Sequence, residues 1–265
     1  MTPYDLIEVF RDTQRLFRTT PALWERTQES QRRSMIYLEG YTSPIRRAGA
    51  ACTIEVVETT TFQCARELRP HYPKVAVLNF ANPHEPGGGV LRGAMAQEEC
   101  LCRCSDLYEV LSQPYFRRHY YSYHYRHCDE LFSDRLIYSP GVTVIKSDDP
   151  VPQLLEAPFS VDVITCAAPF LNNHVMKTND QLLEIYRSRI RNILEAAIAQ
   201  GVDCLILGAF GCGAFGNDPG LMSRAFADLL IRERYSEAFR RAVFAIKRTG
   251  SYCPNIRAFQ QAFEG

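Results

Sequence analysis

Short apolar runs and helix-like apolar repeats alternate along the chain. Apolar runs of roughly four to eight residues are typical of buried strands, and apolar residues spaced three or four apart are typical of amphipathic helices. The runs predict strands at residues 75–81, 161–167, 203–207 and 242–246. Shorter or alternating segments predict further strands at residues 53–58, 136–139 and 142–146, the last two joined by a turn at Pro140 and Gly141. The almost wholly apolar segment 161–167 is expected in the middle of a sheet.

The helix-like repeats begin at recognisable N-terminal signals. Thr2 and Thr20 each precede a proline, as N-cap residues do, and they predict amphipathic helices at 3–18 and 21–33. Further helices are predicted at residues 61–69, 97–111, 179–200, 219–232 and 255–263. Strands and helices alternate without a repeat or a linker. This predicts one layered α/β/α domain over residues 1–265, with residues 1–50 as a helical extension packed on it.

A glycine-rich loop and two carboxylates follow the strand predicted at 75–81. Gly87, Gly88 and Gly89 stand together, and Gln97-Glu98-Glu99 opens the next predicted helix. Adjacent glycines allow left-handed backbone and a close approach to a ligand. The alternative interpretation is a flexible turn followed by acidic residues that favour a helix N-terminus.

A second glycine-rich loop, Gly208 to Gly216, follows the strand at 203–207 and precedes a helix. Its alternating glycines place several backbone N–H groups before a helix N-terminus, an arrangement that binds a diphosphate. The loop matches neither the dinucleotide-binding Gly-x-Gly-x-x-Gly pattern nor a phosphate loop ending in Gly-Lys-Ser/Thr. Hydride transfer and triphosphate hydrolysis therefore lose support. In an open α/β sheet, both loops are expected at the carboxyl ends of strands, where ligands bind.

The composition is that of an ordinary globular protein, with 46% hydrophobic and 23% charged residues. The 30 basic and 30 acidic side chains give zero net charge, which argues against general nucleic-acid binding. The first residues carry no secretion signal, and no apolar run reaches roughly 18 residues. A cytoplasmic, non-membrane protein with reduced cysteines is expected. Cys100, Cys102 and Cys104 would diverge on a helix and could not share a metal ion.

Histidines and aromatic residues crowd the segment after the first loop and its helix. His119, His124, His127 and Cys128 suggest a zinc site, and the aromatic residues of 115–125 suggest a surface for base stacking. Neither interpretation is favoured, because the histidine spacing matches no familiar ligand pattern and aromatic-rich helices usually pack against a core. No metal ion and no cofactor are expected. Residues 147–150 are expected to form a solvated loop.

Adjacent glutamates without a nearby nucleophile and base suit the cleavage of a glycosidic bond. The reaction passes through an oxocarbenium-like state and needs an acid that protonates the departing oxygen and then accepts a proton from water. Burial raises the pKa of a glutamate enough for that task, and a second carboxylate can hold ribose hydroxyls. A diphosphate loop, a ribose and a glycosidic bond together indicate an ADP-ribose substrate.

The order of these motifs resembles the microbial-type poly(ADP-ribose) glycohydrolases of the macrodomain superfamily. Their signature is three glycines, a short spacer and Gln-Glu-Glu, and here seven residues separate Gly89 from Gln97. The resemblance extends to residues 78–83, 138–142, 163–169 and 208–217. It implies an α/β protein with a three-layer α/β/α macrodomain-like fold, a mixed central sheet and additional N-terminal helices.

The resemblance also implies roles for individual residues. Glu99 would be the general acid and base, and Glu98 would hold ribose hydroxyls. Asn82 would contact the same ribose, and Phe215 would press on it. Further contacts to ADP-ribose are implied for Gly87, Gly88, Gly89, Gln97, Gly211, Cys212, Gly213 and Ala214, with Cys212 acting through its N–H. The N-terminal helices are expected to form walls of the adenine pocket.

The expected activity is hydrolysis of ribose–ribose bonds in poly(ADP-ribose) on modified proteins, mainly from the chain end. Two alternatives stay open. One is a hydrolase of mono-ADP-ribosyl groups on proteins or nucleic acids, which would use the same acid. The other is a module that binds ADP-ribose without cleaving it, although such a module has no need of the paired glutamates.

Overall fold

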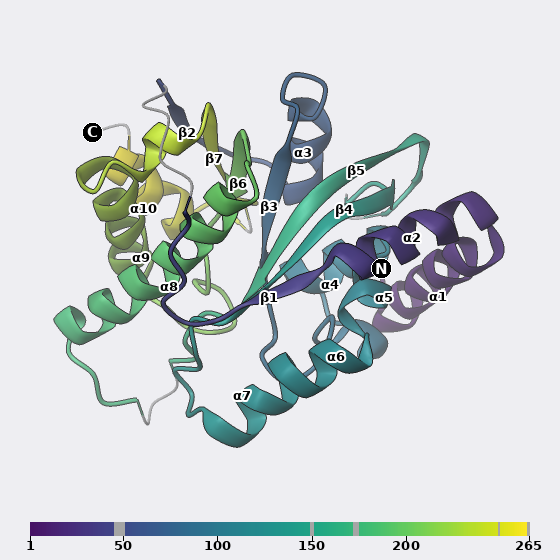
Figure 1. The fold of residues 1–265 in the computed structure, drawn as a ribbon, viewed down its shortest axis with the longest axis horizontal. Coiled ribbons are helices and arrows are strands. Elements are labelled where there is room, and N and C mark those ends of the chain that lie inside the picture. The colour runs from purple at the N-terminus through teal and green to yellow at the C-terminus, as the bar shows by residue number, and fades with distance from the viewer. Residues whose placement is uncertain (45–50, 149–150, 172–174, 249, 264–265) are drawn as a thin grey trace.

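The computed structural model describes residues 1–44, 51–148, 151–171, 175–248 and 250–263. Within them, a seven-stranded sheet has helices on both faces (Figure 1). Its strands, in spatial order, are β1 (Met35–Tyr37), β4 (Leu136–Lys146), β5 (Leu154–Cys166), β3 (Val75–Phe80), β6 (Cys204–Leu207), β7 (Arg241–Ala245) and β2 (Thr53–Val57). Strand β4 runs antiparallel to β1 and β5, and the other neighbours are parallel, so the sheet is mixed.

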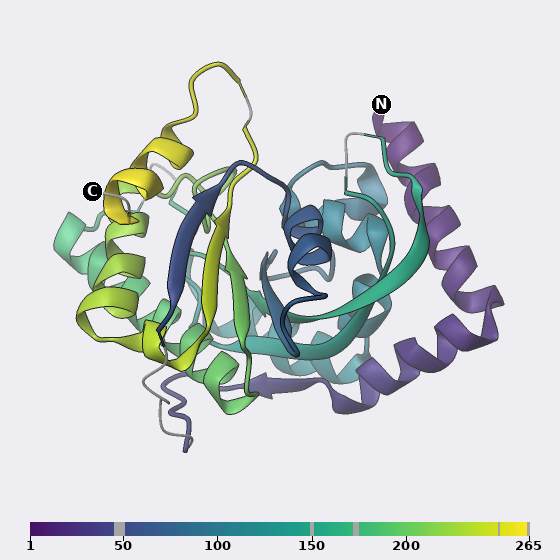
Figure 2. The same ribbon diagram turned by 90° about the horizontal axis from the view of Figure 1, so that it is seen from above.

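Side chains that alternate along each strand divide the core between the two faces of the sheet. Ala76 and Leu78 of β3 belong to a cluster with the helices on one side (Figure 2), which are α8 (Asn179–Ala199), α9 (Pro219–Ala227) and α10 (Pro254–Phe263). Val75 and Val77 belong to a second cluster on the opposite face. Its helices include α3 (Thr61–Leu68), α4 (Gln97–Cys104), α5 (Leu107–Leu111) and α6 (Pro114–Phe116), and α7 (Ser122–His127) follows. The expected α/β/α layering is confirmed.

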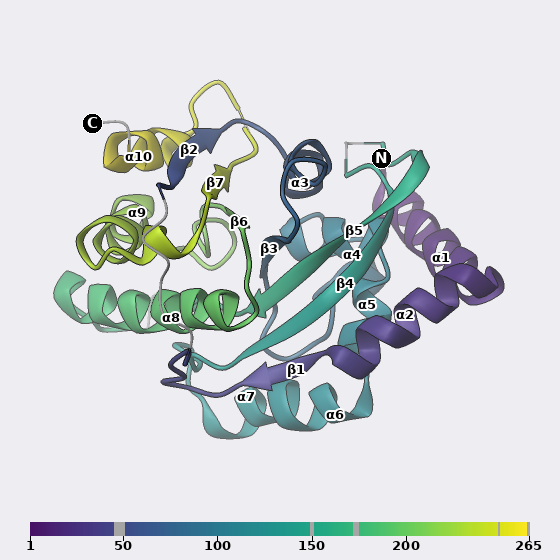
Figure 3. The same ribbon diagram turned by 45° about the horizontal axis from the view of Figure 1, so that its top comes forward.

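The N-terminal helices α1 (Pro3–Thr19) and α2 (Pro21–Arg33) run along the β4 side of the molecule, away from α10 (Figure 3). The buried Thr13 hydroxyl donates to the Arg103 carbonyl at 2.6 Å, and the buried Thr27 hydroxyl donates to the Asp106 carboxylate at 2.9 Å. Both bonds tie the helices to α4 and the turn that follows it. The predicted limit of the extension falls within residues 45–50, outside the described residues.

The prediction of two short strands around a Pro140-Gly141 turn is wrong. The structure has one long strand, β4, with a register shift between Ser139 and Val142. Gly141 has a φ of +70°, and its N–H donates to Asp162 at 2.9 Å. The glycine and proline therefore make a bulge within a strand, which bends it without ending it.

The predicted helix at 97–111 is broken into α4 and α5. Ser105 has extended backbone and forms a bridge to Val144. The Asp106 carboxylate then accepts a hydrogen bond from the Thr143 N–H at 2.8 Å. A tertiary contact to β4 thus interrupts an apolar pattern that is continuous in the sequence. The short strand β1 was not predicted, and β5 begins earlier than expected, at Leu154.

Candidate active site

One cavity of about 310 Å³ opens at the carboxyl ends of the parallel strands. Phe80 ends β3, and Ala168, Ala209, Ile246 and Thr59 follow shortly after β5, β6, β7 and β2. Each parallel strand therefore supplies a wall, as in other open α/β sheets. The other lining residues are Thr60, Thr61, Met95, Ala96, Gln97, Cys100, Leu101, Asp148, Gly211, Gly213, Ala214, Phe215, Ala245, Lys247 and Asn255.

No residue of the N-terminal helices lines this cavity. The helices therefore form no wall of this cavity, and the expectation that they form walls of the adenine pocket stays a prediction. They pack behind α4 instead, where a Cβ on Gly93 would collide with the Pro3 carbonyl. Their effect on the site is indirect, through the placement of the loop that ends at α4.

Gln97 fastens the first turn of α4 to the end of β3. Its Oε1 accepts from the Phe80 N–H at 2.8 Å, and its Nε2 donates to the Leu78 carbonyl at 2.7 Å. Strand β6 pairs with β3 only as far as Val77, so the Gln97 amide continues the backbone pairing beyond it. Gln97 lines the cavity, and its amide fixes the start of the helix that carries the two glutamates. Its implied contact with ADP-ribose stays a prediction.

Glu98 is 2% exposed and is held by the strand beneath it. Its Oε1 accepts from Asn79 Nδ2 at 3.2 Å, and its Oε2 accepts from the Asn82 N–H at 2.7 Å. Burial raises the pKa of Glu98 to about 8 against the lowering effect of these bonds, and the neighbouring Glu99 carboxylate raises it further. Glu98 therefore retains its proton near neutral pH.

Glu99 is 7% exposed. Of the four carboxyl oxygens of Glu98 and Glu99, only one of Glu99 accepts no hydrogen bond from the described residues. Its Oε1 accepts from the Gly89 N–H at 2.8 Å. Its Oε2 is buried and has no hydrogen-bond partner among the described residues. Buried carboxylate oxygens normally have partners, so this atom is an exception. Neither Glu98 nor Glu99 is among the residues that line the cavity.

The triple glycine leaves room for the protein's own side chains. A Cβ on Gly88 would lie 2.5 Å from Glu99 Oε1 and 3.2 Å from Glu98 Oε2, and the residue has a φ of +55°. A Cβ on Gly87 would lie 2.9 Å from the Tyr108 ring. The three glycines are absent from the cavity lining, so their close contacts in this structure are with the carboxylates and the adjoining core. Their implied contact with ADP-ribose stays a prediction.

Asn82 closes the turn that leads from β3 to the glycines. Its Oδ1 accepts from the N–H groups of His84 at 2.8 Å and Glu85 at 2.9 Å. Its backbone N–H is the one that holds Glu98. The residue therefore supports the pair through its backbone, and the ribose contact implied for it stays a prediction.

The second loop lies across the cavity. Gly211 has a φ of +71°, and a Cβ there would lie 2.5 Å from both Ala168 Cβ and Asn217 Nδ2. Asn217, 2% exposed, spans the loop by donating to the carbonyls of Gly211 at 2.9 Å and Pro169 at 2.8 Å. Among the described residues, no group accepts a hydrogen bond from the N–H groups of the segment 213–215. Backbone N–H groups without an internal acceptor can bind an anion, and a diphosphate is the anion expected for this loop.

Phe215 and Cys212 differ in what they offer to a ligand. The Phe215 ring lines the cavity, with the Phe170 ring 5.6 Å behind it. The N–H of Cys212 donates to the Ala209 carbonyl at 3.1 Å, and burial raises the pKa of its thiol to about 12. Cys212 therefore shapes the turn, and its N–H is already engaged within the loop.

The described residues contain no group of three or more His, Cys, Asp or Glu side chains that is placed to hold a metal ion. His124 is fully buried, and its ring nitrogens contact the Tyr120 carbonyl and the Ser133 hydroxyl. Among the same residues, no helix combines the length and apolar character needed to cross a membrane.

The comparisons with known proteins agree with this geometry. A family model described as the catalytic domain of microbial-type PARG, poly(ADP-ribose) glycohydrolase, matches residues 16–147. The poly(ADP-ribose) glycohydrolase structure from Thermomonospora curvata is 34% identical, with a TM-score of 0.86, and the match covers 98% of this chain and 100% of that one. The chain belongs to the microbial-type poly(ADP-ribose) glycohydrolase family.

Two liganded structures of poly(ADP-ribose) glycohydrolases are also similar to the chain. The T. curvata enzyme bound to the inhibitor ADP-HPD is 34% identical, with a TM-score of 0.85, over 98% of this chain and 100% of that chain. The Deinococcus radiodurans enzyme in complex with ADP-ribose is 34% identical, with a TM-score of 0.79, and the match covers 90% of this chain and 96% of that one. A search among curated proteins finds no match.

Three residues of this family member support the site and were missed in the sequence. Asn79 is a fully buried amide within an apolar strand, and that single polar residue was the available signal. Asn217 was given no role in the site, yet its side chain spans the second loop, and Asp218 caps the helix that follows. Asp148 was placed in a solvated loop, yet it is buried, lines the cavity and accepts from the Phe62 N–H at 2.8 Å. Asp149 and Pro150 of that loop lie outside the described residues.

Proposed function

We propose that the protein hydrolyses the ribose–ribose O-glycosidic bonds of poly(ADP-ribose) carried by modified proteins, mainly from the chain end, and releases ADP-ribose. Membership of the glycohydrolase family supports the reaction class. The observation that supports the mechanism is Glu99 Oε2, a buried carboxylate oxygen without a partner among the described residues. We further infer that residues 1–265 act as one catalytic domain.

Glu99 is the proposed general acid and base. It protonates the departing ribose oxygen as the bond to the anomeric carbon breaks and positive charge develops on the sugar. The same carboxylate then accepts a proton from the water that attacks the anomeric carbon. Burial raises the pKa of the neighbouring Glu98 to about 8, so Glu98 is uncharged near neutral pH and places no second negative charge beside Glu99.

Glu98 is the proposed anchor for the ribose. Both of its oxygens accept hydrogen bonds from β3 and the turn after it, so its position is set before the substrate binds. Each oxygen has a second lone pair that can accept from a ribose hydroxyl. The N–H groups of 213–215 are proposed to hold the diphosphate, and Phe215 to contact the ribose between the diphosphate and the glutamates.

The test follows ADP-ribose release from defined poly(ADP-ribose), from mono-ADP-ribosylated protein and from mono-ADP-ribosylated DNA. Wild-type protein should degrade the polymer, and Glu99→Gln should slow it by about 10³-fold while ADP-ribose still binds. Glu67→Gln, a change of an exposed glutamate on α3, is the matched control and should have wild-type activity. A chelator should leave the rate unchanged.

Each alternative predicts a distinct result in the same assay. Faster release from the mono-ADP-ribosylated substrates than from the polymer would favour the mono-ADP-ribosyl hydrolase. Binding of ADP-ribose without turnover of any substrate would favour the binding module. Glu99→Gln protein that is as active as wild type would exclude Glu99 as the acid.

A further inference from the structure

A row of aromatic rings leads from the cavity to the surface. It starts at Phe215, whose ring centroid lies 6.3 Å from that of Phe132. The His84 ring follows at 5.5 Å from Phe132, and Tyr125 at 5.8 Å from His84. His84 and Tyr125 are exposed, and Tyr125 has 76% of its surface free. Three separate segments of the chain therefore bring their rings together beside the site.

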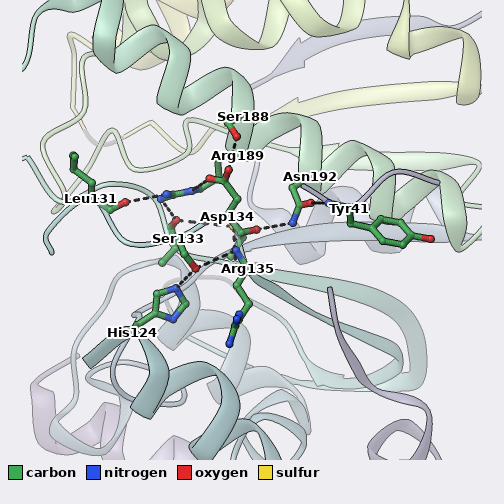
Figure 4. Close-up of polar contacts among 11 residues, drawn as sticks. Tyr41, His124, Leu131, Ser133, Asp134, Arg135, Ser188, Arg189 and Asn192 are labelled. Atoms are coloured by element: carbon green, nitrogen blue, oxygen red, sulfur yellow. Dashed lines mark hydrogen bonds and ion pairs between the residues drawn. The ribbon is translucent and has the colours of Figure 1, made fainter. Parts of the chain in front are cut away.

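Phe132 is held in place by an unusual backbone and a buried polar network. Its φ is +56°, a value that is costly for a bulky residue and persists where the surroundings enforce it. Arg189 donates to the Leu131 carbonyl at 2.9 Å and to Asp134 at 3.0 Å (Figure 4). The Ser133 hydroxyl, one residue after Phe132, contacts His124 Nε2 at 3.0 Å. The residues on both sides of Phe132 are thus fixed.

The same segment is joined to the second glycine loop. The Phe170 N–H donates to the Glu130 carbonyl at 2.7 Å, and the Leu171 N–H donates to the Phe215 carbonyl at 2.8 Å. Phe132 and Phe215 are therefore parts of one connected wall.

The row also lies next to the catalytic pair. His84 donates its backbone N–H to Asn82, and the N–H of Asn82 donates to Glu98. His84, the ring next to Phe132, is thus two residues from Asn82, which hydrogen-bonds directly to Glu98. The rings of His84 and Phe132 are therefore close to the turn that holds Glu98.

The chemistry of the polymer places a nucleobase at this point. In poly(ADP-ribose), the departing oxygen is a ribose hydroxyl of the next unit's adenosine, and that ribose bears its adenine on the adjacent carbon. The adenine of the leaving unit is therefore close to the acid when the bond breaks. Aromatic side chains bind bases by stacking on their faces.

We propose that Phe132, His84 and Tyr125 form a stacking surface for the adenine of the ADP-ribose unit on the leaving side of the scissile bond. This inference rests on the proposed function, since it assigns a second substrate subsite to the same reaction. Packing alone does not explain the row, because two of its four rings, His84 and Tyr125, are exposed. It also favours a polymer over substrates whose leaving group has no base.

The test compares two substrates that differ only on the leaving side. One is di(ADP-ribose), and the other is its analogue with hydrogen in place of the adenine of the leaving unit. The variants are Tyr125→Ala, His84→Ala and Phe132→Asn, the last because asparagine tolerates a positive φ. The conservative Phe132→Trp retains a ring, and Tyr115→Ala removes an exposed ring that is not part of the row.

The ring deletions should lower kcat/KM for di(ADP-ribose) by about tenfold and leave the adenine-free analogue unchanged. Phe132→Trp and Tyr115→Ala should behave as wild type on both substrates. Equal losses on both substrates, or no loss on either, would overturn the stacking surface while leaving the proposed function intact. Wild-type protein that cleaves neither substrate would instead overturn the proposed function and the inference with it.

Discussion

The two glycine-rich loops look alike in sequence but differ in which atoms occupy the space beside their glycines. In the first, the space that Gly88 leaves free is taken by the carboxylates of Glu98 and Glu99. In the second, a Cβ on Gly213 would meet no atom within 4 Å, and Gly213 is exposed. The first loop thus positions the reacting groups, whereas the second leaves backbone donors open. A glycine in a loop indicates that another group lies close to the backbone, but it does not identify that group.

Among substitutions of the glycines in the two loops, the largest effect is expected from Gly88→Ala. The added methyl group displaces Glu99 Oε1, and a φ of +55° is unfavourable for alanine, so kcat should fall by about 100-fold. The assay is polymer hydrolysis, with ADP-ribose binding measured alongside. Gly141→Ala is the matched control, since Gly141 has a φ of +70° with no atom near its Cβ position. If both variants lose activity equally, backbone strain and not the carboxylate contact is responsible.

Gly211→Ala should affect binding more than chemistry. Its methyl group would collide with Ala168 and Asn217 and shift the open N–H groups, so the Kd for ADP-ribose should rise by about tenfold. Gly213→Ala, two residues away, should change it by no more than about twofold. Calorimetry with ADP-ribose measures both constants. Equal constants for the two variants would contradict the division of roles within the loop.

Asn79→Leu tests a positioning residue under the first loop. The change removes the donor to Glu98 Oε1 with little change in volume, so kcat should fall by about tenfold with a smaller change in KM. The Asn79 bond lowers the pKa of Glu98, so its loss should move the basic limb of the pH–rate profile to higher pH. A reduced kcat with an unmoved profile would indicate a purely structural role.

Stability is expected to depend on pH through Glu98 of the first loop, and the buried Asp106 carboxyl adds in the same direction because burial raises its pKa to about 7. Burial raises the pKa of Glu98 from 4.5 to about 8, so the folded protein holds a proton that the unfolded chain has lost. The contribution of Glu98 to the free energy of unfolding should therefore fall as pH rises between these values, by up to about 5 kcal/mol, since each pKa unit corresponds to about 1.4 kcal/mol. Urea unfolding across this range should show that Glu98→Gln lacks this fall. Gly213→Ala should keep the wild-type slope, and equal slopes for wild type and Glu98→Gln would contradict the raised pKa.

Much of the fold was predictable because it rests on local patterns. The apolar runs at 75–81 and 203–207 correspond to β3 and β6, and the proline after Thr20 marks the start of α2. The errors came where a distant contact decides the backbone. The helix is interrupted at Ser105 because this residue forms a bridge with Val144 of β4. Strand β4 has a bulge at Gly141, where Asp162 accepts the glycine N–H. Neither partner can be identified from spacing alone.

By itself, the sequence determined the layered fold, the two glycine loops and the glutamates as candidates for glycosidic chemistry, because residue type and order fix these. Only the tertiary structure decided how the two glutamates differ. Glu98 is held on both oxygens by β3 and its turn, and Glu99 keeps one buried oxygen without a partner among the described residues. Adjacent identical residues have the same local propensities, so only their three-dimensional surroundings can give them different tasks.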